Sequence, residues 1–289
     1  MFLLHIGVGG SSWLDWVIQP DVLLLCAVLG WAYFYTVTRL RERISDAGRV
    51  KRSQVVSFSL GILTLYAATG GPMHQLADTY LASAHMLQHI LLMLVVAPLL
   101  LAGIPSWVWQ ALLRRPGVLP VARTLTHPVV ALAVFNGVLL LTHLPSAIDL
   151  QLHQAWAHLL VHVVQVGAGL LMWWPILSTV PELPRISYPA QMGYLFLQSL
   201  LPSVMAAFIT FADTVIYTFY EEAPRIWNLS AISDQQIAGL IMKLLGSLIL
   251  WTFIVVVFFK WYEREEGESR GPRWEEVAGE LEELGLTKR

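Results

Sequence analysis

Two pairs of histidines are spaced four positions apart in the sequence, the spacing that places both side chains on the same face of an α-helix. The pairs are His85 with His89 and His158 with His162, and residues four apart stack one turn from each other along a helix. Two imidazoles held in this way can bind one metal ion. We therefore expect a metal site that is built on these two segments.

The softness of the neighbouring ligands indicates which metal this site favours. Imidazole accepts copper, zinc, iron or nickel, whereas thioether and thiolate groups favour Cu(I). Met73, Met86, Met93 and Cys26 are expected toward the same end of the helices, and this mixture indicates copper as the cofactor, in the form of Cu(I). A single cysteine excludes an internal disulfide and a Cys-x-x-Cys site, so histidine must supply most of the ligands.

The composition is that of a membrane protein. Hydrophobic residues make up 56% of the 289 residues and charged residues 13%, and the mean hydropathy of +0.61 lies outside the range of soluble domains. Apolar runs that can cross a hydrocarbon core of about 30 Å as helices occur seven times. They lie at residues 21–38, 53–70, 84–103, 128–144, 155–177, 189–211 and 236–259. Because lipid offers no partner for backbone N–H and C=O groups, we predict an all-α fold, a polytopic bundle of seven transmembrane helices.

Basic residues indicate how this bundle is oriented. They gather in alternate loops, at 39–52, at 114–123, at Arg185 and from Lys260 onward, whereas the opposite loops contain Arg225 alone. The positive-inside rule then places the N-terminus outside and the C-terminus in the cytoplasm.

This topology divides the chain into three parts. We expect an extracytoplasmic segment at 1–20, the transmembrane domain at 21–260 and a cytoplasmic acidic tail at 261–289. Within the tail, apolar residues recur at helical spacing over 273–286 with glutamates opposite, which predicts a short amphipathic helix. Membrane lipid is an expected partner, and nucleic acid is not.

Seven histidines share the outer side in this topology. Besides the two pairs they are His74, His143 and His153, which we predict as ligands through which a metal ion arrives or leaves. Of the other two, His5 lies on the N-terminal segment and His127 faces the cytoplasm. Titratable residues that had merely collected at the interfaces would be scattered over both sides, so the asymmetry favours a functional cluster.

Three further residues are predicted to support the metal ligands. Gln88 borders the first pair, Met242 is expected to face the same cavity, and Asp234 is predicted to accept a hydrogen bond that orients a metal-bound imidazole. The alternative for Asp234 is a cap on its own helix. Lys243 is the one basic residue inside a span, and it lies nearly opposite Asp234 around the helix, so we do not expect these two to pair. Gly239 is expected to let a neighbouring helix approach closely.

The third span carries a run that resembles the CtaG family of cytochrome c oxidase assembly proteins. The run is His85-Met-Leu-Gln-His89-Ile-Leu-Leu-Met93, followed by Ala97-Pro98-Leu99 and Gly103-Ile-Pro105. The spacing His158-x-x-x-His162 and the string Asp234-Gln-Gln-x-Ala-Gly-x-x-Met242 extend the resemblance over most of the chain. This resemblance implies an assembly factor for haem–copper oxidases that acts in copper-centre maturation on the outer side of the bacterial cytoplasmic membrane. Lys243 departs from it, because the family leads us to expect an apolar or aromatic residue there.

We therefore predict a membrane assembly factor that binds copper at His85, His89, His158 and His162 and assists its delivery to cytochrome c oxidase. The step is ligand exchange rather than catalysis. The expected protein partners are subunits of the oxidase and a copper donor protein. Two alternatives remain open: a membrane oxidoreductase that uses a histidine-bound metal or a b-type haem, and a metal-free scaffold for oxidase subunits.

Overall fold

The computed structural model describes residues 19–44 and 47–269, and every regular element in these ranges is helical. The all-α fold is therefore confirmed for this part of the chain. Most of the predicted N-terminal segment, with His5, lies outside the described residues. So does the predicted amphipathic helix at 273–286.

Within the described ranges, five helices are long and apolar enough to cross a membrane. They are α1 (Pro20–Thr38), the run Ala82–Gly103, α10 (Ala155–Leu177), α11 (Tyr188–Thr210) and α13 (Ala231–Ser269). Two bent pairs pass the same test: α2 (Arg52–Thr69) with Gly71–Tyr80, bent by 43°, and α7 (Val118–Leu125) with α8 (Pro128–Thr142), bent by 71°. The described part of the chain thus has five to seven candidate membrane spans, where the sequence predicts seven.

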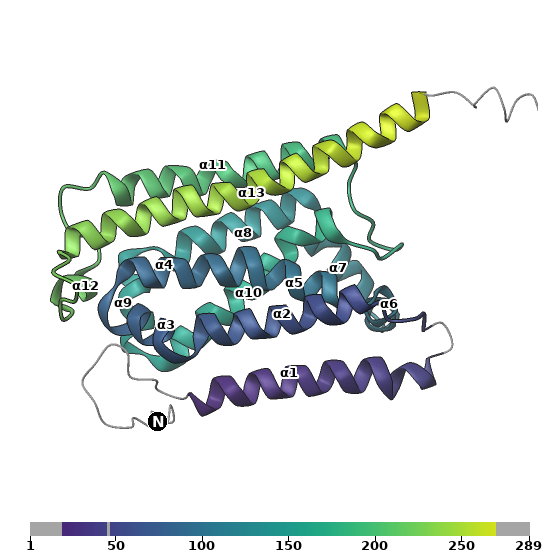
Figure 1. Cartoon of the computed structure of the whole chain (residues 1–289), viewed down its shortest axis with the longest axis horizontal. Helices are drawn as coiled ribbons and strands as arrows, with labels where there is room; N and C mark the ends of the chain where they lie inside the picture. The colour runs from purple at the N-terminus through teal and green to yellow at the C-terminus, as the bar shows by residue number, and fades with distance from the viewer. Residues whose placement is uncertain (1–18, 45–46, 270–289) are drawn as a thin grey trace, which may run out of the picture.

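The helices form a bundle with short helices at both ends (Figure 1). Helices α11 and α13 pack along one side, and α1 packs against α2 on the other. At one end lie α3 (Gly71–Gln75), α9 (Pro145–His153) and α12 (Thr218–Glu222), and at the opposite end lies α6 (Ser106–Leu113). The basic residues of η1 (Leu40–Arg43), directly after α1, lie at the α6 end, away from α3, α9 and α12. The predicted orientation in the membrane stays a prediction.

The second span bends where glycine and proline interrupt it. Helix α2 ends at Thr69, Gly71 adopts a φ of 62°, and Pro72 opens α3. A positive φ is accessible to glycine at little cost, so the chain can turn sharply here. It continues through α3 into η2 (Leu76–Tyr80), a π-helical segment. The segment after α2, which lies between two predicted spans, is therefore helical and packs against α4 of the next span.

The third span changes from α-helix to π-helix just beyond the first histidine pair. It consists of α4 (Ala82–Ile90), the π-helical η3 (Leu91–Val96) and α5 (Ala97–Gly103). In such segments the backbone hydrogen bonds join residues five apart instead of four, and they are frequent at functional sites. The indole Nε1 of Trp173 in α10 donates to the carbonyl of Met93 at 3.1 Å. This bond fixes α10 against the third span.

Glycines allow two of the close helix contacts. A methyl group at Gly169 of α10 would lie 2.7 Å from Cβ of Ala97, and one at Gly239 of α13 would lie 2.9 Å from the carbonyl oxygen of Ala206 in α11. Both positions therefore require the absence of a side chain. The close approach predicted at Gly239 is confirmed.

Candidate metal centre

Six of the seven histidines predicted on the outer side come together at the end of the bundle that carries α3, α9 and α12. Within the pairs, the ring centroids of His85 and His89 are 4.1 Å apart, and those of His158 and His162 are 4.3 Å apart. Each pair thus shares a helix face, as the spacing predicts. Their role as metal ligands stays a prediction.

The two pairs face each other across α4 and α10. The ring centroids of His85 and His158 are 6.0 Å apart, and those of His89 and His162 are 6.1 Å apart. The spacing of the histidines predicts the geometry within each pair but leaves open whether the two helices are neighbours. The structure makes them neighbours.

His74 and His143 extend this group at its two ends. The ring of His74 lies 5.3 Å from that of His158, and the ring of His143 lies 5.5 Å from that of His89. Together with the two pairs they form a continuous series of ring contacts. We call these six residues the histidine cluster: His74, His85, His89, His143, His158 and His162.

His153 is not brought into the histidine cluster. It is exposed at the end of α9, where its Nδ1 lies 3.2 Å from the carboxylate of Asp149 and its ring packs on Phe219. It does line a surface pocket together with Asp78, Asp149 and Glu222. This pocket adjoins the histidine cluster through Asp78.

Asp78 is a candidate ligand that the sequence analysis missed. Its Oδ2 lies 3.1 Å from Nε2 of His74 and 3.2 Å from Nδ1 of His158. One donor atom from each of these three residues lies within 4.8 Å of the other two, and we call this group the Asp78 site. The spacing His74-x-x-x-Asp78 was the available signal, but it falls between the predicted spans 53–70 and 84–103, where no helix was predicted.

Gln88 holds the ring of His74, one of the three residues of the Asp78 site. It is fully buried, and its amide Nε2 donates to the carbonyl of Ala68 at 2.9 Å and lies 3.2 Å from Nδ1 of His74. The amide nitrogen carries hydrogens only, so Nδ1 accepts and Nε2 of His74 is the nitrogen directed at Asp78. A hydrogen bond of this kind fixes the orientation of a ligand ring.

Deeper in the bundle, the histidine cluster contains buried nitrogens with no hydrogen-bond partner among the described residues. They are both ring nitrogens of His85, both of His89, and Nε2 of His143. Nδ1 of His143 donates to the carbonyl of Leu139 at 2.7 Å, so its Nε2 carries a free lone pair. Buried polar atoms normally have partners, and imidazole nitrogens of this kind are suited to bind a metal ion.

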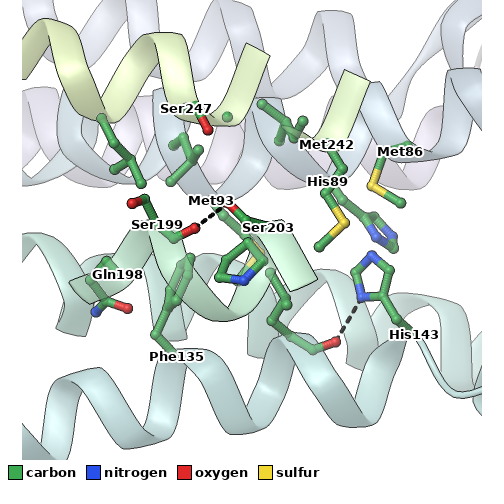
Figure 2. A pocket seen from close by; sticks show the side chains of 16 residues that line it. Met86, His89, Met93, Phe135, His143, Gln198, Ser199, Ser203, Met242 and Ser247 are labelled. Atoms are coloured by element: carbon green, nitrogen blue, oxygen red, sulfur yellow. Dashed lines mark hydrogen bonds between the residues drawn. The ribbon is translucent and has the colours of Figure 1, made fainter. Parts of the chain in front are cut away.

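A cavity of about 40 Å³ adjoins His89 and His143 (Figure 2). Met86, Met93 and Met242 line it, as predicted for Met242. Serines and Gln198 line its other end. Of the remaining sulfur residues considered from sequence, Cys26 is buried elsewhere, in an apolar cluster to which α1, α2, the third span and α6 contribute.

Asp234 caps a neighbouring helix. Its carboxylate accepts from the backbone N–H groups of Ala82 and Ser83, at 2.7 and 3.2 Å, and from the Ser83 hydroxyl. These groups form the first turn of α4, so Asp234 satisfies N–H groups that a helix leaves unpaired at its N-terminus. Its contacts therefore differ from both sequence interpretations, the imidazole partner and the cap on α13. Ser230 instead accepts from the N–H of Ser233 in the first turn of α13.

The loop between α11 and α13 covers the histidine cluster. The hydroxyl of Tyr220 in α12 donates to the carbonyl of Ala77 at 2.7 Å, and its ring centroid lies 6.2 Å from that of His85. Burial, followed by the charges of Asp78 and Asp234, raises the pKa of the Tyr220 phenol well above its usual value. It therefore remains a hydrogen-bond donor at neutral pH.

Comparison with known proteins places this chain in a family. The family model described as cytochrome c oxidase caa3 assembly factor (Caa3_CtaG) matches residues 31–264. The uncharacterized protein ML1998 of Mycobacterium leprae (strain TN) is 23% identical over 254 residues, which are 82% of this chain and 38% of that protein. The chain thus spans less than half the length of this relative. No solved structure matches. Since the family match covers most of the chain, this protein belongs to the family of cytochrome c oxidase caa3 assembly factors.

Proposed function

We propose that the protein binds copper at the histidine cluster and assists its delivery to cytochrome c oxidase during assembly. The observation that carries this proposal is the set of five buried imidazole nitrogens, on His85, His89 and His143, that lack a hydrogen-bond partner among the described residues. Their burial without partners is costly, and binding of a metal ion would offset this cost. The family match supports cytochrome c oxidase as the recipient of the copper, because the family's members are assembly factors for the oxidase.

The arrangement is suited to passing a metal ion by ligand exchange. Neighbouring rings in the histidine cluster have centroids 4.1–6.1 Å apart along the whole series. An ion can therefore acquire a new ligand before it loses the previous one. The surface pocket beside Asp78 supplies an opening at which a copper donor protein or an oxidase subunit would dock. Ligand exchange of this kind makes and breaks only bonds to the metal ion and converts no substrate, so the proposed role is not enzymatic.

The geometry favours copper over the haem alternative. Rings this close together leave no space for a porphyrin between them, and the adjoining cavity of about 40 Å³ holds only a few water-sized molecules. Under this proposal the site faces the outside of the bacterial plasma membrane. The metal-free scaffold for oxidase subunits is the alternative that the experiment addresses.

Copper content tests the proposal directly. The full chain is purified in detergent, loaded with copper, desalted and measured by mass spectrometry, beside a variant with His85→Gln, His89→Gln, His158→Gln and His162→Gln. We expect the parent to retain copper and the variant to lose it. A His127→Gln variant is the matched control, because His127 is exposed and lies outside the histidine cluster.

The same variants are then compared in cells for the copper content of the oxidase. We expect it to fall in the four-histidine variant and to be unchanged in the control. If the loaded parent retains no more copper than the four-histidine variant, the copper proposal is wrong and the scaffold takes its place.

A further inference from the structure

We propose that Met86 and Met242, together with His89 and His143, form a Cu(I) site that is separate from the Asp78 site. This inference rests on the proposed function, because it divides the histidine cluster into two binding sites of different chemistry. All four residues line the cavity described above. Figure 2 shows the sulfur atoms of Met86 and Met242 at the end of this cavity that holds the two rings.

Three helices deliver these ligands to one point. Met86 and His89 are three residues apart in α4, the spacing that places side chains on one face. Met242 comes from α13, and His143 follows the last residue of α8. The Asp234 cap at the start of α4 fixes α13 against α4 only a few residues before Met86. The contact between the two methionine-bearing helices is thus set by a buried hydrogen bond.

The imidazoles of His89 and His143 have buried nitrogens that can bind a metal ion. Nε2 of His143 is buried without a partner among the described residues, while Nδ1 of the same ring is held by the carbonyl of Leu139. This bond fixes the ring and leaves Nε2 as the free acceptor. His89 contributes a second imidazole, with a ring centroid 5.5 Å away and both nitrogens unpaired within the described residues. Methionines that served packing alone would not require unpaired imidazoles beside them.

The donor types distinguish this site from the Asp78 site. The Asp78 site offers a carboxylate and two imidazoles, a set that suits divalent transition metals. The described residues that line the cavity beside His89 and His143 include no aspartate or glutamate. Thioether and imidazole ligands without a carboxylate select Cu(I) over the divalent ions. The protein therefore offers a harder site at the Asp78 end and a softer site deeper in the bundle.

X-ray absorption at the copper edge tests the softer site. The full chain is loaded with one equivalent of Cu(I) under reducing conditions, and its affinity is measured by competition with a chromophoric Cu(I) chelator. We expect sulfur scattering in the parent and its loss in a variant with Met86→Leu and Met242→Leu. The affinity should fall by at least about tenfold, since even groups that only support metal ligands are typically worth that much.

Two variants serve as controls for this experiment. Met172→Leu removes a methionine that is fully buried elsewhere in α10, and leucine conserves the volume at all three positions. It should match the parent in Cu(I) affinity, and helicity measured by circular dichroism should be equal in all variants. Asp78→Asn alters the Asp78 site, and it should retain the sulfur scattering.

The outcomes separate this inference from the proposed function. The Cu(I) site at Met86 and Met242 is wrong if the parent binds Cu(I) with nitrogen or oxygen scattering alone. It is also wrong if the variant with both methionines replaced binds Cu(I) as tightly as the parent. In either case the proposed copper binding stands. If the parent binds no copper, the proposed function fails, and this inference fails with it.

Discussion

The carboxylate of Asp234 in α13 accepts a hydrogen bond from the backbone N–H of Ala82 in α4, with 2.7 Å between Oδ2 and nitrogen. The two residues are 152 positions apart in the chain, and both are buried. Ala82 lies three residues before His85. The last helix of the bundle therefore fixes the start of the helix that carries the first histidine pair.

Replacing Asp234 by alanine should destabilise the protein. The backbone N–H groups of Ala82 and Ser83 would lose their acceptor inside the bundle, at a cost of about 1–3 kcal/mol. We expect a lower midpoint of thermal unfolding in detergent, measured by circular dichroism. Asp213→Ala is the control, because Asp213 is exposed in the loop before α12; equal midpoints for both variants would contradict the capping role.

Gly239→Ala should destabilise the contact between α11 and α13. The added methyl would meet the carbonyl of Ala206 at 2.9 Å, and overpacking of this kind typically costs about 1–3 kcal/mol. Gly193→Ala in α11 is the matched control, since nothing lies within 4 Å of its added methyl. There, the higher helix propensity of alanine should leave the thermal midpoint unchanged or raise it. Two midpoints that shift in the same direction would show that the close approach does not matter.

Gln88→Leu should weaken metal binding at the Asp78 site. The change removes the amide that holds His74 and leaves the size of the side chain similar, so the His74 ring gains rotational freedom. Loss of such a supporting hydrogen bond typically costs about 10–100-fold in metal affinity, and titration with a divalent metal measures it. Gln191→Leu also removes a buried glutamine, but one that bonds Ile186 at the far end of α11, and its affinity should equal that of the parent.

Tyr220→Phe should loosen the cover over the histidine cluster. The variant keeps the ring near His85 but leaves the carbonyl of Ala77 without its donor, a loss of about 1 kcal/mol. We expect faster hydrogen exchange of the α12 amides and faster release of bound copper. Tyr262→Phe, at an exposed position in α13, should change neither rate. Unchanged exchange in α12 would mean that the hydroxyl does not hold the cover.

Local spacing predicted part of the candidate site correctly. The period of an α-helix is fixed, so residues four apart had to share a face, and the 4.1 and 4.3 Å separations within the pairs follow from that rule. The apolar character of the spans and the all-α fold follow in the same way from what lipid permits. These predictions needed no knowledge of which helices are neighbours.

Contacts between helices that are distant in the chain could not be predicted from the sequence. Asp234 was placed correctly at the start of the last span, but its partner in α4 depends on how two distant helices pack. Asp78 was missed because it lies between the predicted spans 53–70 and 84–103, whereas the chain continues there as helix and turns Asp78 toward His74. His153 was grouped with the other histidines by depth alone, and its exposed position shows that a shared level in the membrane does not bring side chains together.

The shared position of Asp78 between His74 and His158 determines the charge balance of the whole histidine cluster. Among the described residues, Asp78 is the one carboxylate within ion-pair distance of a ring in the histidine cluster. With neutral imidazoles, a divalent ion that binds the Asp78 carboxylate in its deprotonated form leaves a single net positive charge, and Cu(I) at the site formed with Met86 and Met242, which offers no carboxylate, leaves the same. A divalent ion at that second site would leave twice this charge among apolar helices, where uncompensated charge is costly. The position of Asp78 therefore favours a divalent ion at one end of the histidine cluster and Cu(I) at the other, by charge as well as by ligand type.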